Sequence, residues 1–181
     1  MEYYTLKLLG LTRKLPLMYV GKRTRLANLT VLGDVELVKK LADVLTAKLR
    51  AYDLDCVVGP QIKIVPLVHG IALRLGHKRF VVCRKTIKPY MVNPLILKPD
   101  SHVPKHIKQL VINGTDVQFL KNKRVALIDD VVSTGVTMRL LHKLMDKVGA
   151  RVIVNVTIIR QGEQLTPIKD LIYLGELPIF T

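Results

Sequence analysis

The chain of 181 residues carries 29 Lys and Arg against 14 Asp and Glu, a formal net charge of +15, and 49% of its residues are hydrophobic. This apolar content excludes a disordered polycation, because such a chain can bury a sizeable core, and the length suits one compact domain. No apolar run approaches the roughly 18 residues that a membrane helix needs, and the first residues lack the basic-then-apolar order of a signal peptide. We therefore expect a soluble, cytoplasmic protein that does not contact membranes.

The first third of the chain predicts short strands followed by a helix. Residues 3–31 alternate apolar and basic runs, broken at Gly10 and Gly21, which is typical of two or three antiparallel strands. Asp34 then precedes apolar residues at i, i+3 and i+4 spacing over 35–49. This pattern predicts an amphipathic helix of about four turns with Asp34 as its N-cap.

The middle of the chain changes to an alternation of buried strands and helices. We expect a strand at 55–59, a helix at about 64–75 that ends at a glycine, and a strand at 79–83. Successive strands joined by helices require parallel pairing through right-handed crossovers. Cys56 and Cys83 lie inside these apolar strands, so we expect buried thiols rather than a disulfide.

A long loop and a hairpin are expected next. Residues 85–107 carry four prolines and no clear period, which predicts a functional loop of the lid type. Strands at 109–112 and 116–120 flank Asn113-Gly114, a dipeptide typical of a β-hairpin turn. Residues 124–181 then predict a strand, a loop, a helix, a further strand and two short terminal strands.

These elements define one α/β domain over residues 1–181. We expect a mostly parallel, doubly wound sheet of about five strands within 34–160, a region that includes the lid loop and hairpin at 85–120. A small β hood is expected from residues 1–33 together with a C-terminal segment at 161–181. In open sheets of this kind the ligand lies at the carboxyl ends of the strands.

The positive charge is confined to two blocks. Residues 1–30 hold six basic residues and one acid, residues 74–124 hold twelve and two, and the remainder holds eleven of each sign. A balanced molecule with two basic blocks indicates a polyanionic partner that these blocks meet. Nucleic acid and a phosphorylated small molecule both fit this description.

Residues 125–138 hold the strongest site motif in the chain. A buried strand leads into Asp129 and Asp130, then into a loop of small residues, and then into a helix. Unpaired N–H groups at such a helix N-terminus favour an anion, and Gly135 allows the backbone to approach it closely. We therefore expect a monophosphate site here, with added hydroxyl donors from Ser133, Thr134 and Thr137.

The two adjacent acids indicate that the ligand has a second component besides the monophosphate. Their mutual repulsion is tolerated when sugar hydroxyls or a divalent ion bridge them. Because neighbouring residues of a strand point to opposite sides, we expect at most one of the two to face a ligand directly. The alternative interpretation is that both acids cap the helix terminus.

The segment Leu127-Ile128-Asp129-Asp130-Val131-Val132-Ser133-Thr134-Gly135-Val136-Thr137 closely resembles the phosphoribosyl-pyrophosphate (PRPP) signature of type I phosphoribosyltransferases. The similarity extends backward in register. Residues 57–76, followed by Phe80-Val81-Val82-Cys83-Arg84-Lys85, resemble the pyrophosphate loop, helix and strand end of adenine phosphoribosyltransferases. The resemblance covers about residues 50–160 and implies the type I phosphoribosyltransferase fold.

The resemblance also implies an activity: a purine nitrogen displaces pyrophosphate from PRPP and yields a nucleoside monophosphate, with magnesium carried by PRPP, in a homodimer. It implies that Asp129 and Asp130 address the ribose hydroxyls and lie near the magnesium. The hood would choose the base through residues such as Leu26, Leu29 or Ile179. The 5′-phosphate would be held by Ser133, Thr134, Gly135, Val136 and Thr137, and pyrophosphate by Gln61, Ile62, Lys63, Arg84 and Lys85.

The chain departs from the family pattern at three places. The loop at 61–64 has Gln, Ile, Lys and Ile where the family has an acid, a small residue, Arg and Gly. Val136 replaces the second glycine of the phosphate loop, and Ile112 falls where the family has the acid that helps to protonate the base. The nearest carboxylate to that position in the sequence is Asp116.

Three hypotheses therefore remain. The first is a purine phosphoribosyltransferase, with adenine as the default base by resemblance. The second is a PRPP- or nucleotide-sensing transcriptional regulator on the same fold, with its basic surface directed at nucleic acid. The third is a transferase for a different acceptor, which the missing acid would permit.

Overall fold

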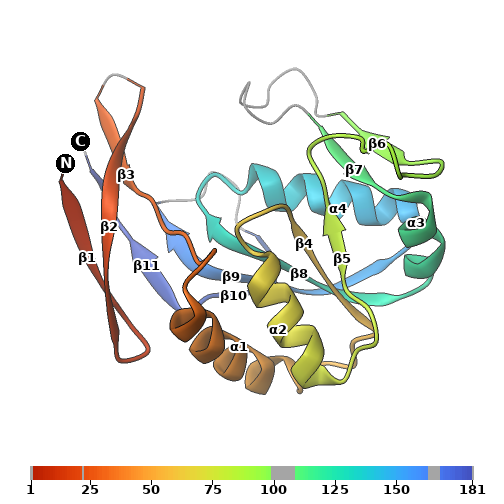
Figure 1. Cartoon of the computed structure of the whole chain (residues 1–181), viewed down its shortest axis with the longest axis horizontal. Helices are drawn as coiled ribbons and strands as arrows, with labels where there is room; N and C mark the ends of the chain where they lie inside the picture. Colours follow the sequence, from red (N-terminus) through yellow and green to blue (C-terminus); the bar gives the residue numbers. More distant parts are fainter. Residues whose placement is uncertain (1, 22, 99–108, 163–167, 181) are drawn as a thin grey trace.

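The computed structural model describes residues 2–21, 23–98, 109–162 and 168–180. A central parallel sheet is covered by helices on both faces, and a separate antiparallel sheet stands beside it (Figure 1). This arrangement confirms the predicted α/β class with its mostly parallel, doubly wound sheet.

The central sheet is parallel at every strand pair that the described residues form. It contains six strands in this part of the chain, rather than the five expected, because the C-terminal segment contributes two short ones. Their order across the sheet is β10 (Leu171–Ile172), β9 (Arg151–Gln161), β8 (Arg124–Val132), β4 (Cys56–Pro60) and β5 (Val81–Cys83), and β11 (Gly175–Leu177) also pairs with β9.

The helices begin and end where local chemistry favours it. Asp34 is the N-cap of α1 (Val35–Leu49), and its carboxylate accepts a hydrogen bond from the N–H of Leu37 at 3.0 Å. Gly76, in the left-handed region with φ of 74°, ends α2 (Val65–Leu75). The other helices are α3 (Gly114–Leu120) and α4 (Val136–Val148). None of the helices within the described ranges is long and apolar enough to span a bilayer.

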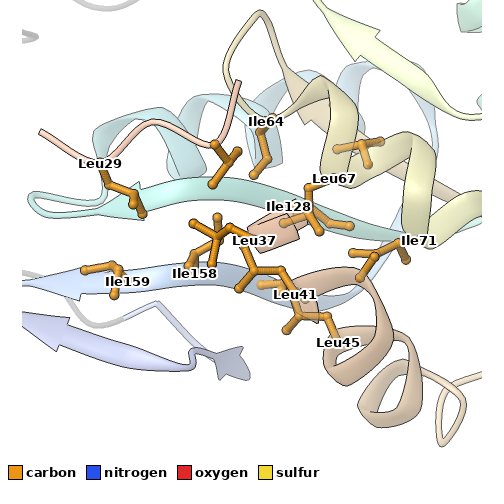
Figure 2. Close-up of a cluster of buried hydrophobic side chains, with 14 of the residues drawn as sticks. Leu29, Leu37, Leu41, Leu45, Ile64, Leu67, Ile71, Ile128, Ile158 and Ile159 are labelled. Atoms are coloured by element: carbon orange, nitrogen blue, oxygen red, sulfur yellow. The ribbon is translucent and has the colours of Figure 1, made fainter. Parts of the chain in front are cut away.

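Two apolar layers hold the helices to the sheet. On one face, Leu37 and Leu41 of α1 and Ile71 of α2 pack over Ile128 and Ile158 of the sheet (Figure 2). On the other face, the buried side of α4 packs over β4, β5 and β8. Each fully buried aliphatic side chain contributes roughly 1.5–3 kcal/mol relative to exposure, so these layers dominate the stabilisation of the domain.

The two cysteines belong to the second of these apolar layers. Cys56 and Cys83 are free thiols with no exposed surface, as predicted. Burial raises the pKa of each thiol to about 12, so both remain protonated and unreactive at neutral pH.

The hood is the four-stranded antiparallel sheet of β1 (Tyr3–Leu8), β2 (Leu11–Val20), β3 (Thr24–Ala27) and β12 (Ile179–Phe180), together with residues 28–33, which follow β3. Arg13 of β2 ties it to α1 through hydrogen bonds to Asp34 at 2.6 Å and to Glu36 at 2.8 Å. The Arg13 guanidinium holds the pKa of Asp34 below its ordinary value, so the helix cap stays ionised.

The C-terminal segment divides between the two sheets, which corrects the expectation that all of 161–181 joins the hood. β10 and β11 pair with β9, and only β12 pairs with β3 of the hood. β9 is long and would otherwise expose an unpaired edge, which the two short strands cover.

The predicted hairpin at Asn113-Gly114 is wrong. β7 (Leu110–Ile112) pairs instead with β6 (Leu95–Leu97), and residues 114–120 form α3. Asn113 is extended, with φ of −67°, and its Oδ1 accepts a hydrogen bond from the N–H of Val92 at 2.9 Å. Gly114 is required because a Cβ there would lie 2.4 Å from the carbonyl oxygen of Val92. The lid loop predicted at 85–107 therefore contains a strand, and its residues 99–107 lie outside the described part of the chain.

Gly59 of β4 sets the distance between α2 and the sheet. A Cβ at this position would lie 2.7 Å from Val68 Cγ2 and 2.9 Å from the main-chain oxygen of Ile128. We expect Gly59→Ala to lower the free energy of unfolding by about 2–3 kcal/mol, because the backbone of β8 cannot retreat. Urea denaturation measures this change.

Gly70→Ala is the matched control, since its added methyl meets only side-chain atoms, Ala42 Cβ at 3.2 Å and Arg74 Nη1 at 3.4 Å, and gains helix propensity. Equal denaturation midpoints for the two variants would contradict the role given to Gly59.

Candidate active site

The candidate site lies where β4 and β8 end. Val58 pairs with Leu127 in parallel, so the loop at 61–64 and the acids Asp129 and Asp130 reach the same edge of the sheet. Between them lies a cavity of about 310 Å³, called here the acid cavity. Its lining includes Gln61, Ile62, Lys63, Lys85, Asp129, Asp130 and Thr137.

Both acids line this cavity. The main-chain N–H of Asp130 donates to Asp129 Oδ1 at 2.9 Å, and the N–H of Val131 donates to Asp130 Oδ1 at 2.9 Å. These hydrogen bonds between each carboxylate and the next main-chain N–H fix the orientation of the two side chains at the end of β8. Each carboxylate is thus held by the main-chain N–H of the next residue at the wall of the cavity.

Asp129 is the more buried of the two acids, with 6% of its surface exposed. Burial and then the charge of Asp130 raise the pKa of Asp129 well above its ordinary value, and Lys85 opposes this shift. A cation or a set of hydroxyl donors placed beside the pair would stabilise the ionised form of Asp129 and so lower its pKa again.

Lys63 extends from the loop after β4 to the hood. Its Nζ lies 2.9 Å from Asn28 Oδ1, 3.2 Å from the carbonyl oxygen of Leu29 and 3.9 Å from Asp130 Oδ2. The loop itself is anchored by the N–H of Gln61, which donates to the carbonyl of Cys83 at 2.8 Å. One cation therefore touches the hood and the acid pair at once.

The predicted phosphate loop runs from the end of β8 to the first turn of α4. Gly135 is left-handed, with φ of 75°, and caps the helix, while Val136 is the first helical residue and so tolerates its branched side chain. Thr137 lines the acid cavity, whereas Ser133, Thr134, Gly135 and Val136 form the loop beside it. The sequence analysis did not identify Arg139, whose Nη2 donates a hydrogen bond to the carbonyl of Thr134 at 2.8 Å. Its position one helical turn after Gly135 is the sequence feature that could have indicated this contact.

The basic pair after β5 divides between two environments. Lys85 lines the acid cavity. The Arg84 guanidinium lies 5.7 Å from the centre of the Tyr90 ring and is not part of that lining.

No carboxylate of the described residues replaces the lid-strand acid of the family. Ile112, at that position, is fully buried. Asp116 forms an ion pair with Arg79, which precedes β5 and so lies toward the amino end of the sheet, away from Asp129. Asp116 therefore cannot serve the site in this arrangement.

A second cavity, of about 370 Å³, lies under the hood and is called here the hood cavity. Of the predicted base contacts, Leu26 and Leu29 line it, and Ile179 pairs with Leu26 across the sheet. Met18 also pairs with Leu26, so three apolar side chains form one row on one face of the hood. Lining residues that the sequence did not identify are Met18, Val20, Asn28 and Gln161.

The two cavities meet at Lys63, Asp130 and Val131, which line both. The fold thus places an acid pair and a helix N-terminus at the strand ends, with an apolar cavity alongside. Residues 32–179 match the family model described as the phosphoribosyl transferase domain. The chain belongs to this family and is of the type I, adenine phosphoribosyltransferase-like kind.

Similar proteins include enzymes for different purines. The chain is 27% identical to a hypoxanthine/guanine phosphoribosyltransferase of Methanococcus voltae, over 72% of this chain and 67% of that protein. It is 26% identical to adenine phosphoribosyltransferase 1 of Triticum aestivum, over 83% of this chain and 78% of that protein. The solved adenine phosphoribosyltransferase of Thermoanaerobacter pseudethanolicus shares the fold, with a TM-score of 0.67, 20% identity, and coverage of 97% of this chain and 96% of that one.

The buried Asp129 should make stability depend on pH. Above its ordinary pKa of 3.8 the unfolded chain ionises this carboxyl while the folded chain keeps it protonated, so the wild type loses stability as pH rises toward the folded value. The Asp129→Asn side chain does not ionise, so this variant does not lose stability in that way as pH rises. Its amide oxygen can still accept the hydrogen bond from the N–H of Asp130. We expect its melting temperature to exceed that of the wild type by about 2–4 °C at pH 7 and to match it near pH 4.

Scanning calorimetry at the two pH values measures the difference. Asp146→Asn, at an exposed position of α4, is the control for the loss of one negative charge. A melting difference for Asp129→Asn that is the same at both pH values would contradict this account of Asp129.

Proposed function

We propose that the protein is a purine phosphoribosyltransferase, which joins a purine base to PRPP and releases pyrophosphate, with adenine as the default base. The observation that carries the proposal is the junction of the two cavities at Lys63 and Asp130. A transferase of this class must hold a diphosphate sugar and a flat base in contact at one carbon, and two cavities with a shared wall provide that geometry.

The acid cavity suits the diphosphate sugar. Lys63 and Lys85 supply positive charge for pyrophosphate, together with the backbone of Gln61 and Ile62. The loop from Ser133 through Thr134, Gly135 and Val136 to Thr137 offers N–H and hydroxyl donors for the 5′-phosphate. Asp129 and Asp130 then face the ribose hydroxyls that lie between the two phosphate groups.

Magnesium fits the same place. Its preferred ligands are carboxylate and phosphate oxygens, and it commonly uses one or two carboxylates and completes its shell from the substrate and water. The acid pair supplies such carboxylates, so a magnesium ion carried by PRPP would be held near Asp129 and Asp130.

The transfer breaks the bond from ribose C1 to the diphosphate oxygen and forms a bond from C1 to a purine nitrogen. Negative charge grows on the leaving diphosphate, where Lys63 and Lys85 stabilise it, and positive charge grows on the ribose, beside Asp130. The base would lie along the row of Met18, Leu26 and Ile179. We also expect a homodimer, as the family resemblance implies.

The first experiment measures pyrophosphate release from PRPP and magnesium with adenine, hypoxanthine, guanine and xanthine. We expect turnover with one base, adenine by default, and a loss on the order of 100-fold or more in Asp129→Asn/Asp130→Asn, because this variant removes the charge opposite the developing positive centre. Pyrophosphate release that needs no base, or survives in the variant, would contradict the proposal. If none of the four purines supports pyrophosphate release, the remaining hypotheses are a transferase for a different acceptor and a regulator.

A nucleotide-sensing regulator is the second candidate, favoured by an exposed row of residues on the β1–β2 ribbon. In register, Thr5 pairs with Lys14 and Lys7 with Thr12, all exposed, and Tyr3 is 54% exposed at the end of the row. The described residues of this row include no carboxylate. A polyanion such as single-stranded nucleic acid would meet lysines and an aromatic ring there.

The regulator reading predicts binding of a labelled oligonucleotide with a steep salt dependence. Lys7→Glu/Lys14→Glu should then weaken binding and reduce the magnitude of the log–log salt slope by about 2, one for each lost phosphate contact. Lys48→Glu/Lys147→Glu, which makes the same charge change on the helices, is the control. Binding that is equally weakened by both pairs would reflect net charge alone and would contradict a binding face on the ribbon.

A further inference from the structure

The ammonium group of Lys63 has three N–H donors, and the hood occupies two of them. Asn28 Oδ1 accepts one at 2.9 Å and the carbonyl oxygen of Leu29 accepts another at 3.2 Å. Asp130 Oδ2, at 3.9 Å, is beyond hydrogen-bond distance. One N–H therefore remains free on a cation that lines the acid cavity.

We propose that Asn28 is a positioning residue for diphosphate binding: it holds the Lys63 ammonium at the junction of the two cavities, so that the third N–H is aimed at an anionic oxygen in the acid cavity. The proposal rests on the function proposed above, in which Lys63 is a pyrophosphate cation. It adds that the hood, which lies next to the base, also sets the affinity for the diphosphate.

Asn28 is well placed to fix a flexible lysine. Its main-chain N–H donates to the carbonyl of Pro16 at 3.0 Å, and the next residue, Leu29, is only 2% exposed. The amide of Asn28 therefore stands on an anchored backbone. A free lysine side chain has many rotamers, and part of this conformational entropy would be lost on binding an anion. Prior fixation by Asn28 reduces that loss, which is preorganisation.

Asn28 has a second consequence, because it also lines the hood cavity. Because Asn28 Oδ1 accepts a hydrogen bond from Lys63, the amide group keeps its N–H donors and one further acceptor position for a ligand under the hood. Asn28 is thus a direct link between the contents of the two cavities. Any effect of one ligand on the other through this link is reciprocal in binding free energy.

The test is calorimetric titration of the full chain with inorganic pyrophosphate and magnesium. We expect Asn28→Ala to raise the Kd about five- to tenfold, because the freed Lys63 side chain must then lose rotamer entropy when it binds the anion. Lys63→Met should raise it at least as much, and Asn28→Ala should have no further effect in the Lys63→Met background. This double-mutant cycle separates action through Lys63 from a general structural role, which would persist in that background.

Thr30→Ala is the matched control, since Thr30 is exposed on the same connecting segment and lines neither cavity. It should leave the Kd within twofold of the wild type. An unchanged Kd in Asn28→Ala, or an effect that adds in full to that of Lys63→Met, would overturn the inference while the proposed function stands. A wild-type protein that binds neither pyrophosphate nor PRPP would overturn both.

Discussion

Parallel pairing of β4 with β8 is the constraint on which the site depends. Because both strands run in one direction, the loop that follows β4 and the acids at the end of β8 must meet at one edge of the sheet. Gly59 lets α2 pack closely behind that edge, and the apolar layer of α1 and α2 holds it in place (Figure 2). The strand ends that carry the acid cavity are thus fixed by an apolar framework that takes no part in binding.

The same framework forces an unfavourable arrangement on the acids. A buried carboxyl next to a second carboxylate costs stability that a neutral residue would restore, yet the pair is the feature that a ribose with magnesium would use. Destabilised polar clusters of this kind are common at functional sites, because the ligand supplies the missing partner. Stability and binding therefore oppose each other at Asp129.

Periodicity in the sequence was sufficient for the helices α1, α2 and α4 and for the strand that carries the acids. Periodicity did not predict the structure where tertiary contacts determine the local conformation. Asn113-Gly114 has turn chemistry, but the close approach of Val92 and the pairing of β7 with β6 select a helix start instead. The contact of Lys63 with Asn28 joins residues 35 positions apart, and no local pattern encodes it. The motif at 127–137 was informative because its parts are contiguous in the chain.

The hood is fastened to the body of the protein at both of its ends. At one end, β3 leads through a short segment into α1, and Arg13 of β2 donates a hydrogen bond to Asp34, the N-cap of α1. At the other end, Pro178 alone separates β11 of the central sheet from β12 of the hood. A sheet held by two such short connections cannot swing like a hinged cover. Under the proposed function, a base would enter the hood cavity past the exposed Met18 and Val20, and selectivity for the base would depend on rigid shape rather than on closure.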